Sequence, residues 1–130
     1  MPTATGVEVV DASALAALLF GEPESAQVVG RLGSGRLVAP ALLEFEFANI
    51  CVTKLRRHPQ QRAAIPRGYG IRARIAIEVV PVEQGEVVAA ADASGLTAYD
   101  RAYLWLARRL GAGLITLDRK LAAAMEAPQR

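Results

Sequence analysis

Four acidic side chains of this 130-residue sequence stand beside apolar runs, where an unpaired charge is costly to remove from water. They are Asp11 in VVDASAL, Glu46 in PALLEFEFAN, Asp100 in LTAYDRAYLWLA and Asp118 in LITLDRKL. Carboxylates drawn together repel one another unless a cation lies between them or one of them takes a proton. A group of carboxylates without cysteine or clustered histidine suits a hard, oxygen-binding ion such as Mg²⁺ or Mn²⁺. The four residues therefore predict a divalent metal site if the fold brings them together.

The three aspartates also have a purely structural interpretation. Asp11 and Asp118 each follow a predicted strand and precede a predicted helix, where an aspartate N-cap is worth about 1 kcal/mol. The same position is the ligand-binding edge of an open parallel sheet. Asp100 stands three residues after Thr97, which is the spacing of a capping box. Helix capping and metal binding therefore both remain open for these three residues.

Glu46 is different because it lies inside a predicted helix, where it can cap nothing. Helical spacing places it on one face with Asn49, whereas Glu44 lies about 200° around the helix. We therefore expect Glu44 to be solvated or ion-paired. Lys54 and Arg57 are too far along the helix to neutralise Glu46 by i,i+4 pairing. If Glu46 is buried, a bound cation is the partner that we expect.

Strands and helices alternate along the chain, which implies parallel β-α units and a three-layer α/β fold. We expect a central parallel sheet of four or five short strands flanked by helices. The predicted strands are Val7–Val10, Arg36–Ala39, Glu78–Val82 and Gly113–Leu117. The predicted helices are Ser13–Phe20, Pro23–Leu32 with Gly33 just past its end, Ala41–Leu55, Gln84–Ser94, Thr97–Leu110 and Arg119–Met125.

Two segments carry more particular expectations. The helix over residues 41–55 is apolar almost all round, which predicts that it is largely buried. Residues 56–70 contain Pro59, Pro66, Gly68 and Gly70 and predict a mobile loop or a broken helix. Residues 71–77 are ambiguous.

Composition narrows the class of protein. The length fits one domain over residues 1–130, and a hydrophobic content of 52% is ample for a core. The single cysteine, Cys51, excludes an internal disulfide and is expected to be a buried small hydrophobe. The N-terminus has no basic stretch and Asp11 interrupts its apolar run, so we expect neither a signal peptide nor a membrane span. A cytoplasmic protein is the resulting expectation.

The charge is unevenly distributed although the net charge is only +2. No Asp or Glu occurs between Glu46 and Glu78. That interval holds a run of cations and the only histidine: Lys54, Arg56, Arg57, His58, Arg62, Arg67, Arg72 and Arg74. Clustered Lys and Arg attract phosphates and release counterions on binding, so the interval favours a polyanionic substrate or an acidic partner. A solvated basic face is the alternative.

At these residues the chain closely resembles a PIN-domain ribonuclease, specifically the VapC-type toxins of bacterial toxin–antitoxin pairs. The motifs that carry the resemblance are VVDASAL, PALLEFEFAN, GLTAYDRAYLWLA and LITLDRKL, in the order of the family and over residues 7–121. The resemblance implies a PIN fold and a quartet of acids, Asp11, Glu46, Asp100 and Asp118, that binds Mg²⁺ or Mn²⁺. It also implies supporting roles for Ser13, Asn49 and Thr116.

The resemblance extends to partners. It implies a homodimer and an antitoxin that wraps the toxin and places an extended tail in the acidic groove. Arg101 departs from the family because a small residue commonly follows the third acid. We expect this arginine to place a cation beside the acids, where it could pair with Asp100 or contact phosphate.

The resulting hypothesis is metal-assisted hydrolysis of an RNA phosphodiester. The arginines Arg56, Arg57, Arg62, Arg67, Arg72 and Arg74 would grip the backbone, and single-stranded RNA is the expected target. Two alternatives are a PIN nuclease in RNA processing and a non-catalytic PIN-like RNA-binding module. Tyr103 and Trp105 are assigned to the core or a dimer surface, and His58 to the exposed surface. Tyr99 precedes the third acid and could stack on RNA, but packing is the favoured interpretation.

Overall fold

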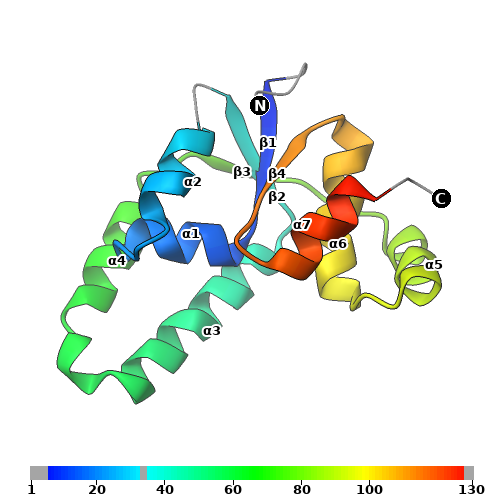
Figure 1. Ribbon diagram of the computed structural model, residues 1–130. Helices are drawn as coiled ribbons and strands as arrows, with labels where there is room; N and C mark the ends of the chain where they lie inside the picture. The colour runs from blue at the N-terminus through cyan, green and yellow to red at the C-terminus, as the bar shows by residue number, and fades with distance from the viewer. Residues whose placement is uncertain (1–5, 33–34, 128–130) are drawn as a thin grey trace.

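A parallel sheet lies between two groups of helices in the computed structural model, which describes residues 6–32 and 35–127 (Figure 1). Within these residues four strands form the sheet, in the order β3-β2-β1-β4, and every pair is parallel. In Figure 1, α1, α2 and α4 lie on one side of the strands, and α5, α6 and α7 lie on the other. The expected three-layer α/β architecture is confirmed.

The elements follow one another in the order that the sequence predicts, with η1 and α4 in the segment expected to be a loop or a broken helix. They are β1 (Val7–Val10), α1 (Ala12–Leu19), α2 (Ser25–Leu32), β2 (Arg36–Ala39), α3 (Leu42–Arg57), η1 (Pro59–Gln61), α4 (Ala64–Arg72), β3 (Ile77–Val79), α5 (Gln84–Ser94), α6 (Ala98–Leu110), β4 (Gly113–Ile115) and α7 (Arg119–Glu126). The predicted Gly33 stop after α2 lies outside the described residues.

The two faces of the sheet each bury one apolar layer, because successive strand residues point to opposite faces. On one face, Val10 and Ile115 pack against buried residues of α1, α2 and α3. On the other face, Val9 and Leu114 pack against buried residues of α6 and α7. The central strand β1 is therefore covered on both sides. This packing holds the end of the strand in place and so fixes the position of the next residue, Asp11.

The carboxyl ends of β1 and β4 meet at one edge of the sheet. Val10 lies opposite Ile115 in the parallel register, and the Asp11 N–H donates to the Ile115 carbonyl (3.1 Å). The first turn of α1 and the segment leading to α7 therefore start side by side. The two predicted motifs around Asp11 and Asp118 come together for this reason.

Residues 56–70 form a broken helix, which is one of the two structures that the sequence predicts. The chain forms η1 and then α4, so this segment is a broken helix rather than a loop, and the second helix continues to Arg72. Pro66 lies in the first turn of α4, where its missing N–H would have no partner within the helix. Gly68 lies against Phe20, and a Cβ at this position would come within 2.4 Å of the phenyl ring. Both residues thus fit inside the helix.

Burial of α3 is also less than the sequence predicts. Its buried residues form one stripe of Leu43, Phe47 and Cys51, as the spacing i, i+4, i+8 requires, while Phe45 and Val52 are exposed. Strand β3 starts one residue earlier and ends three residues earlier than expected, and β4 ends two residues earlier. No helix among the described residues has the length and apolar character needed to cross a membrane.

Candidate functional site

A cleft of about 500 Å³ opens at the edge where β1 and β4 end, and all four predicted acids line it. They come from segments that are far apart in the sequence and close in the fold. The cleft is lined by Asp11, Ala12, Ser13, Phe45, Glu46, Asn49, Ile50, Tyr99, Asp100, Tyr103, Asp118 and Leu121. We call this site the acidic cleft.

Asp11 is the most buried of the four acids, with 5% of its surface exposed. Its Oδ1 accepts hydrogen bonds from the Ser13 hydroxyl (2.7 Å) and the Ala14 N–H (3.0 Å), and its Oδ2 accepts one from the Thr116 hydroxyl. Burial raises the pKa of Asp11, and the three hydrogen bonds oppose that rise, whereas the nearby Asp118 adds to it. The capping of α1 by Asp11 is therefore confirmed, and the same carboxylate faces the cleft.

Glu46 is half-buried and accepts a hydrogen bond from the Tyr103 hydroxyl (2.6 Å). Burial raises the pKa of this carboxyl, the Tyr103 hydrogen bond lowers it, and repulsion from Asp11 and Asp100 raises it further. Burial and the Glu46 carboxylate together raise the pKa of Tyr103 far above its usual range, so its hydroxyl remains a donor. The carboxylates around Glu46 therefore repel one another, and a bound cation would relieve that repulsion.

Tyr103 is the site residue that the sequence analysis missed. Its ring is buried in the core, as predicted, but its hydroxyl reaches the acidic cleft. Residues three apart share a helix face, so its position relative to Asp100 could have revealed it. Packing, the favoured interpretation of Tyr99, is wrong because this residue is exposed at the cleft.

Asp100 and Asp118 lie at the first turns of α6 and α7. The Thr97 hydroxyl accepts a hydrogen bond from the Asp100 N–H (3.1 Å), so the predicted cap of α6 is present. The Asp118 carboxylate accepts one from the Leu121 N–H (3.1 Å) and caps α7. The Asp100 carboxylate is half-buried and that of Asp118 is exposed, so both remain accessible at the cleft.

Two hydroxyl groups connect the acids to the backbone. The Ser13 hydroxyl donates to Asp11 and accepts from the Leu117 N–H (3.0 Å). The Thr116 hydroxyl donates to Asp11 and accepts from the Asp118 N–H (3.0 Å). Each hydroxyl therefore links the Asp11 carboxylate to the backbone of the segment that follows β4. Asn49 is exposed and lines the cleft one helical turn after Glu46.

The donor set of the cleft fits a hard divalent cation by its chemistry. Its acids offer oxygen ligands alone, and Asp11 is buried with only neutral donors around its carboxylate. Across residues 6–32 and 35–127, no three Asp, Glu, His or Cys side chains form a group that could hold a metal ion as they stand. A cation would therefore have to draw the carboxylates closer together.

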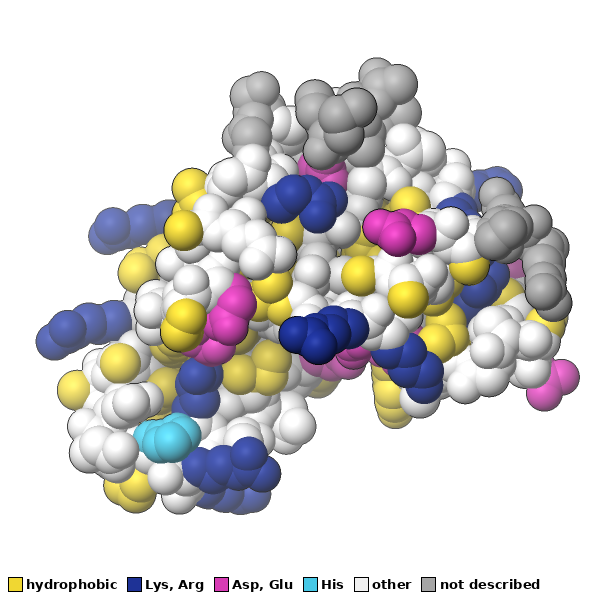
Figure 2. Space-filling view, viewed as in Figure 1, with side chains coloured by type: hydrophobic (Ala, Val, Ile, Leu, Met, Phe, Trp, Pro, Cys, Tyr) yellow, Lys and Arg dark blue, Asp and Glu magenta, His cyan; other side chains and the backbone are white. Residues whose placement is uncertain are grey.

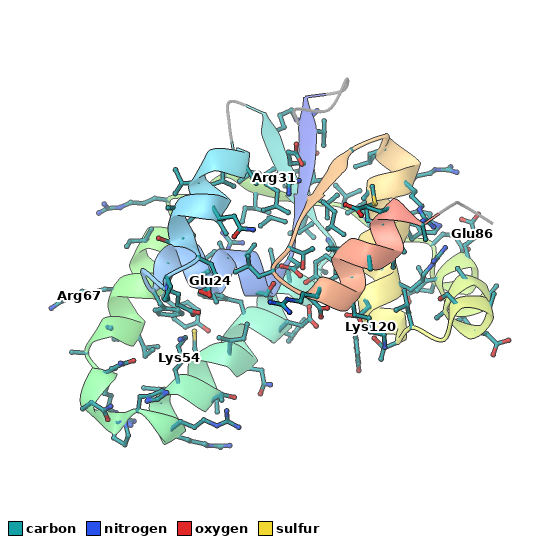
Figure 3. The ribbon with its side chains drawn as sticks, in the orientation of Figure 1. Glu24, Arg31, Lys54, Arg67, Glu86 and Lys120 are labelled. Atoms are coloured by element: carbon teal, nitrogen blue, oxygen red, sulfur yellow. The ribbon has the colours of Figure 1, made fainter. Side chains whose placement is uncertain are left out.

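A second pocket, of about 470 Å³, adjoins the acidic cleft and shares Ser13, Asn49 and Ile50 with it. It is also lined by Lys54, Arg57 and His58 from the end of α3, with Glu22 and Glu24 opposite. Lys54 pairs with Glu22 (3.1 Å), and Figure 3 shows Lys54 turned towards α1 and α2. Arg57 and His58 are exposed at the pocket.

The remaining predicted cations lie on residues 54–74, which we call the basic arm. Lys and Arg side chains and the histidine gather at the lower left of Figure 2, over the end of α3 and η1. Arg72 pairs with Glu44, which confirms that Glu44 is ion-paired. Four arginines of the arm are exposed outside the second pocket, and Figure 3 shows Arg67 pointing away from the molecule. They are Arg56, Arg62, Arg67 and Arg74.

Arg101 does not lie beside the acids, which corrects the expectation from the sequence. It lines a separate pocket with Ser94, Leu96 and Arg108. Burial and the neighbouring Arg108 both lower the pKa of Arg101. The reason is geometric, because successive helical residues point about 100° apart and Asp100 takes the cleft side.

Comparison with known proteins identifies the family. The sequence matches the PIN domain over residues 9–126, and the chain belongs to the PIN domain family. Proteins of this family are typically nucleases that use divalent metal ions, so membership supports nuclease activity, a hydrolase reaction, in general.

A solved structure supports the same fold. The crystal structure of PAE2754 from Pyrobaculum aerophilum is similar, with a TM-score of 0.73 and 25% sequence identity. The similarity covers 98% of this chain and 90% of that one. A comparison with curated proteins finds no match.

Proposed function

We propose that this protein is a metal-dependent endoribonuclease that hydrolyses RNA phosphodiester bonds and acts as the toxin of a toxin–antitoxin pair that blocks translation. The observation that carries the nuclease proposal is the acidic cleft itself. In a chain of the PIN family, four carboxylates from separate segments line one cleft, and the most buried of them has only neutral hydrogen-bond donors.

Asp11 and Asp100 are proposed as direct ligands of Mg²⁺ or Mn²⁺, with Glu46 and Asp118 binding directly or through water. The ion, when bound, would supply Lewis acidity towards water and phosphate. Ser13 and Thr116 hold the Asp11 carboxylate in one orientation, and the Tyr103 hydroxyl does the same for Glu46. Asn49 extends the polar lining along α3.

The second pocket provides a path for the RNA backbone. It joins the acidic cleft through Ser13, Asn49 and Ile50, and it presents Arg57 and His58 to solvent. Contacts between arginine and phosphate supply affinity with little base specificity. The exposed arginines of the basic arm would extend this contact, whereas Arg72 is occupied by Glu44.

The nuclease proposal is tested by cleavage of a single-stranded RNA with Mn²⁺, with Mg²⁺ and with a chelator. Asp11→Asn is expected to reduce the rate more than about 100-fold, because even outer partners of metal ligands cost about 10–100-fold when removed. Asparagine keeps an oxygen that can cap α1, so thermal stability should be preserved. Asp92→Asn, which removes an exposed acid of α5, is the matched control. Cleavage that survives in Asp11→Asn would contradict the proposal.

A non-catalytic RNA-binding module is the second candidate. The observation that favours it is that Asp11 and Asp118 already cap helices, while no described group is arranged to hold a metal ion. Thermal unfolding measured with and without Mn²⁺ distinguishes the two functions. A metal site should gain about 2.7 kcal/mol at a concentration 100 times the Kd, and the gain should disappear in Asp11→Asn. Unchanged unfolding at all metal concentrations would favour the module.

The toxin role, the antitoxin and the homodimer are proposed from the resemblance of the four motifs to VapC-type toxins. Expression should arrest growth, and the product of a small neighbouring gene should restore it. An active nuclease that leaves growth unaffected would instead indicate a PIN nuclease in RNA processing. Sedimentation of the purified chain tests the homodimer separately.

A further inference from the structure

Two aromatic rings stand exposed at the acidic cleft. Phe45 is 77% exposed and Tyr99 is 64% exposed, which makes them the most exposed large hydrophobic side chains among the described residues. Both line the cleft, Phe45 from α3 and Tyr99 from α6. Burying a phenylalanine side chain is worth about 1.5–3 kcal/mol, so this arrangement forgoes stability at the site.

The position of each ring is set by its helix. The buried stripe of α3 is Leu43, Phe47 and Cys51, and Phe45 lies on another side of the helix. Tyr99 is the second residue of α6, two residues after the cap at Thr97. The ring–ring contacts found in the described residues are Phe20–Phe47 and Phe47–Tyr69, which leave the two cleft rings available.

Each ring also directly precedes a carboxylate of the cleft. Phe45 stands before Glu46, and Tyr99 stands before Asp100, so two helices present the same pair of groups to one cleft. Once the proposed divalent cation neutralises the carboxylates, a ligand that meets both pairs needs flat apolar faces next to an anionic backbone. Unpaired nucleobases joined by phosphates have that chemistry, whereas the bases of a duplex are stacked on one another.

We propose that Phe45 and Tyr99 are stacking positions for unpaired nucleobases of the RNA bound at the acidic cleft. This proposal rests on the proposed nuclease function and adds the selection of single-stranded substrate by ring stacking. A protein surface that brings no cation is the less favourable occupant, because covering the rings would also bury the adjacent carboxylates unpaired, and the cores of protein interfaces are depleted of charge.

The test measures RNA binding directly, so that it does not depend on catalysis. Fluorescence anisotropy compares a labelled single-stranded RNA, the same RNA annealed to its complement, and the same backbone with abasic positions. Phe45→Ala and Tyr99→Ala should each weaken binding of the single strand about 5- to 100-fold, the range for loss of one stacked base. Binding of the abasic strand should stay unchanged.

Matched variants separate stacking from general loss of apolar surface. Val52→Ala and Val88→Ala remove exposed apolar groups outside the cleft and should leave binding of all three RNAs unchanged. Phe45→Tyr and Tyr99→Phe keep a ring and should retain most of the single-strand affinity. Thermal unfolding confirms that each variant is folded.

The outcomes distinguish failure of this proposal from failure of the proposed function. Suppose that the wild type cleaves RNA and that the alanine variants bind both the natural and the abasic strand with wild-type affinity. The stacking proposal would then be wrong, and the nuclease proposal would be unaffected. If the wild type neither binds nor cleaves RNA, the proposed function fails and stacking falls with it. Unchanged RNA binding together with a loss of dimer mass in the alanine variants would assign the rings to a protein interface and overturn the proposal.

Discussion

The acidic cleft and the basic arm are built in opposite ways. The cleft lies at the ends of two buried strands, and its deepest acid, Asp11, accepts three hydrogen bonds. Between residues 54 and 74, all of which the structure describes, only Ile65 and Gly68 are buried. Most of the arm's cations extend into solvent.

This difference separates two properties of the proposed enzyme. Groups held by a packed sheet keep a fixed geometry, which metal binding and hydrolysis require. Exposed cations on a thinly packed helix supply long-range attraction and tolerate change. We therefore expect substitutions in the cleft to alter metal binding and rate, and substitutions in the arm to alter RNA affinity and its salt dependence.

After Asp11→Asn, the largest effect is expected for Thr116→Val, which removes the hydroxyl that donates to Asp11 and accepts from the Asp118 N–H. The cleavage rate at saturating RNA should fall about 10–100-fold, with RNA affinity unchanged. Single-turnover kinetics with a binding assay measures both quantities. Ser94→Ala is the control, because it removes a hydroxyl bonded to Ala90 at the end of α5 (2.8 Å). If Thr116→Val changed RNA affinity and left the cleavage rate unaltered, the division of roles between the acidic cleft and the basic arm would be wrong.

Tyr103→Phe should have a smaller effect within the cleft. Glu46 loses its hydrogen bond from Tyr103 while the ring stays in the core. Affinity for Mn²⁺ should fall about tenfold, at the lower end of the range for outer partners of metal ligands. Calorimetric titration with Mn²⁺ measures the change. An unaltered Mn²⁺ affinity would mean that Glu46 takes no part in holding the ion.

Arg57→Gln tests the arm. The slope of log affinity against log salt should become shallower by about 0.7, the value for one phosphate contact with a single strand. The cleavage rate at saturating RNA should not change. Arg109→Gln removes one exposed cation of α6, where it lies over Trp105 outside both regions, and should leave the slope unchanged. Equal slopes for the two variants would show that the second pocket does not contact RNA.

The smallest effect concerns Glu8, a buried acid of β1 outside the cleft, whose carboxylate lies 4.0 Å from the Arg31 guanidinium. Burial raises the pKa of Glu8, and Arg31 partly opposes the rise. The folded state therefore holds this proton more tightly than the unfolded state, and stability falls as pH rises from about 4.5 through the raised pKa. Glu8→Gln removes this fall.

The free energy of unfolding in urea, measured at pH 4, 5.5 and 7 for the wild type and for Glu8→Gln, tests this prediction. The variant should gain stability relative to the wild type as the pH increases, because glutamine has no proton to lose. A difference that stays constant over this range would show that Glu8 is not destabilised by its burial. At each pH the Glu8→Gln variant should have the same activity as the wild type, since Glu8 does not line the acidic cleft.

The same contrast explains what the sequence could predict. The strands around Val7–Val10 and Gly113–Ile115 follow from short apolar runs, and parallel pairing brings the residues after them together. Glu46 was recognisable because an acid inside an apolar helix needs a partner. Tyr103 was not, because a tyrosine in an apolar helix predicts packing, and composition does not reveal where its hydroxyl points.

The structure of the basic arm was harder to predict, because the effect of its proline and glycine residues depends on tertiary contacts. Pro66 and Gly68 indicate a break in a helix when only local propensity is considered. In the fold, Pro66 occupies the first turn of α4, and Gly68 gives room to the Phe20 ring. Likewise, the apolar residues of α3 suggest complete burial, but Phe45 and Val52 face away from the stripe that the core covers.

Helix α1 connects the two regions. It begins after Asp11 and ends before Phe20, whose ring packs against Gly68, stacks on Phe47 (6.0 Å between centroids) and lies beneath the Lys54 ammonium (5.1 Å). Eight residues at 1.5 Å each make a rod of about 12 Å. Inserting one residue would turn its far end by about 100°. In the proposed enzyme, the length of this helix therefore sets the distance along the RNA between the bond that is cleaved and the phosphates that the basic arm contacts.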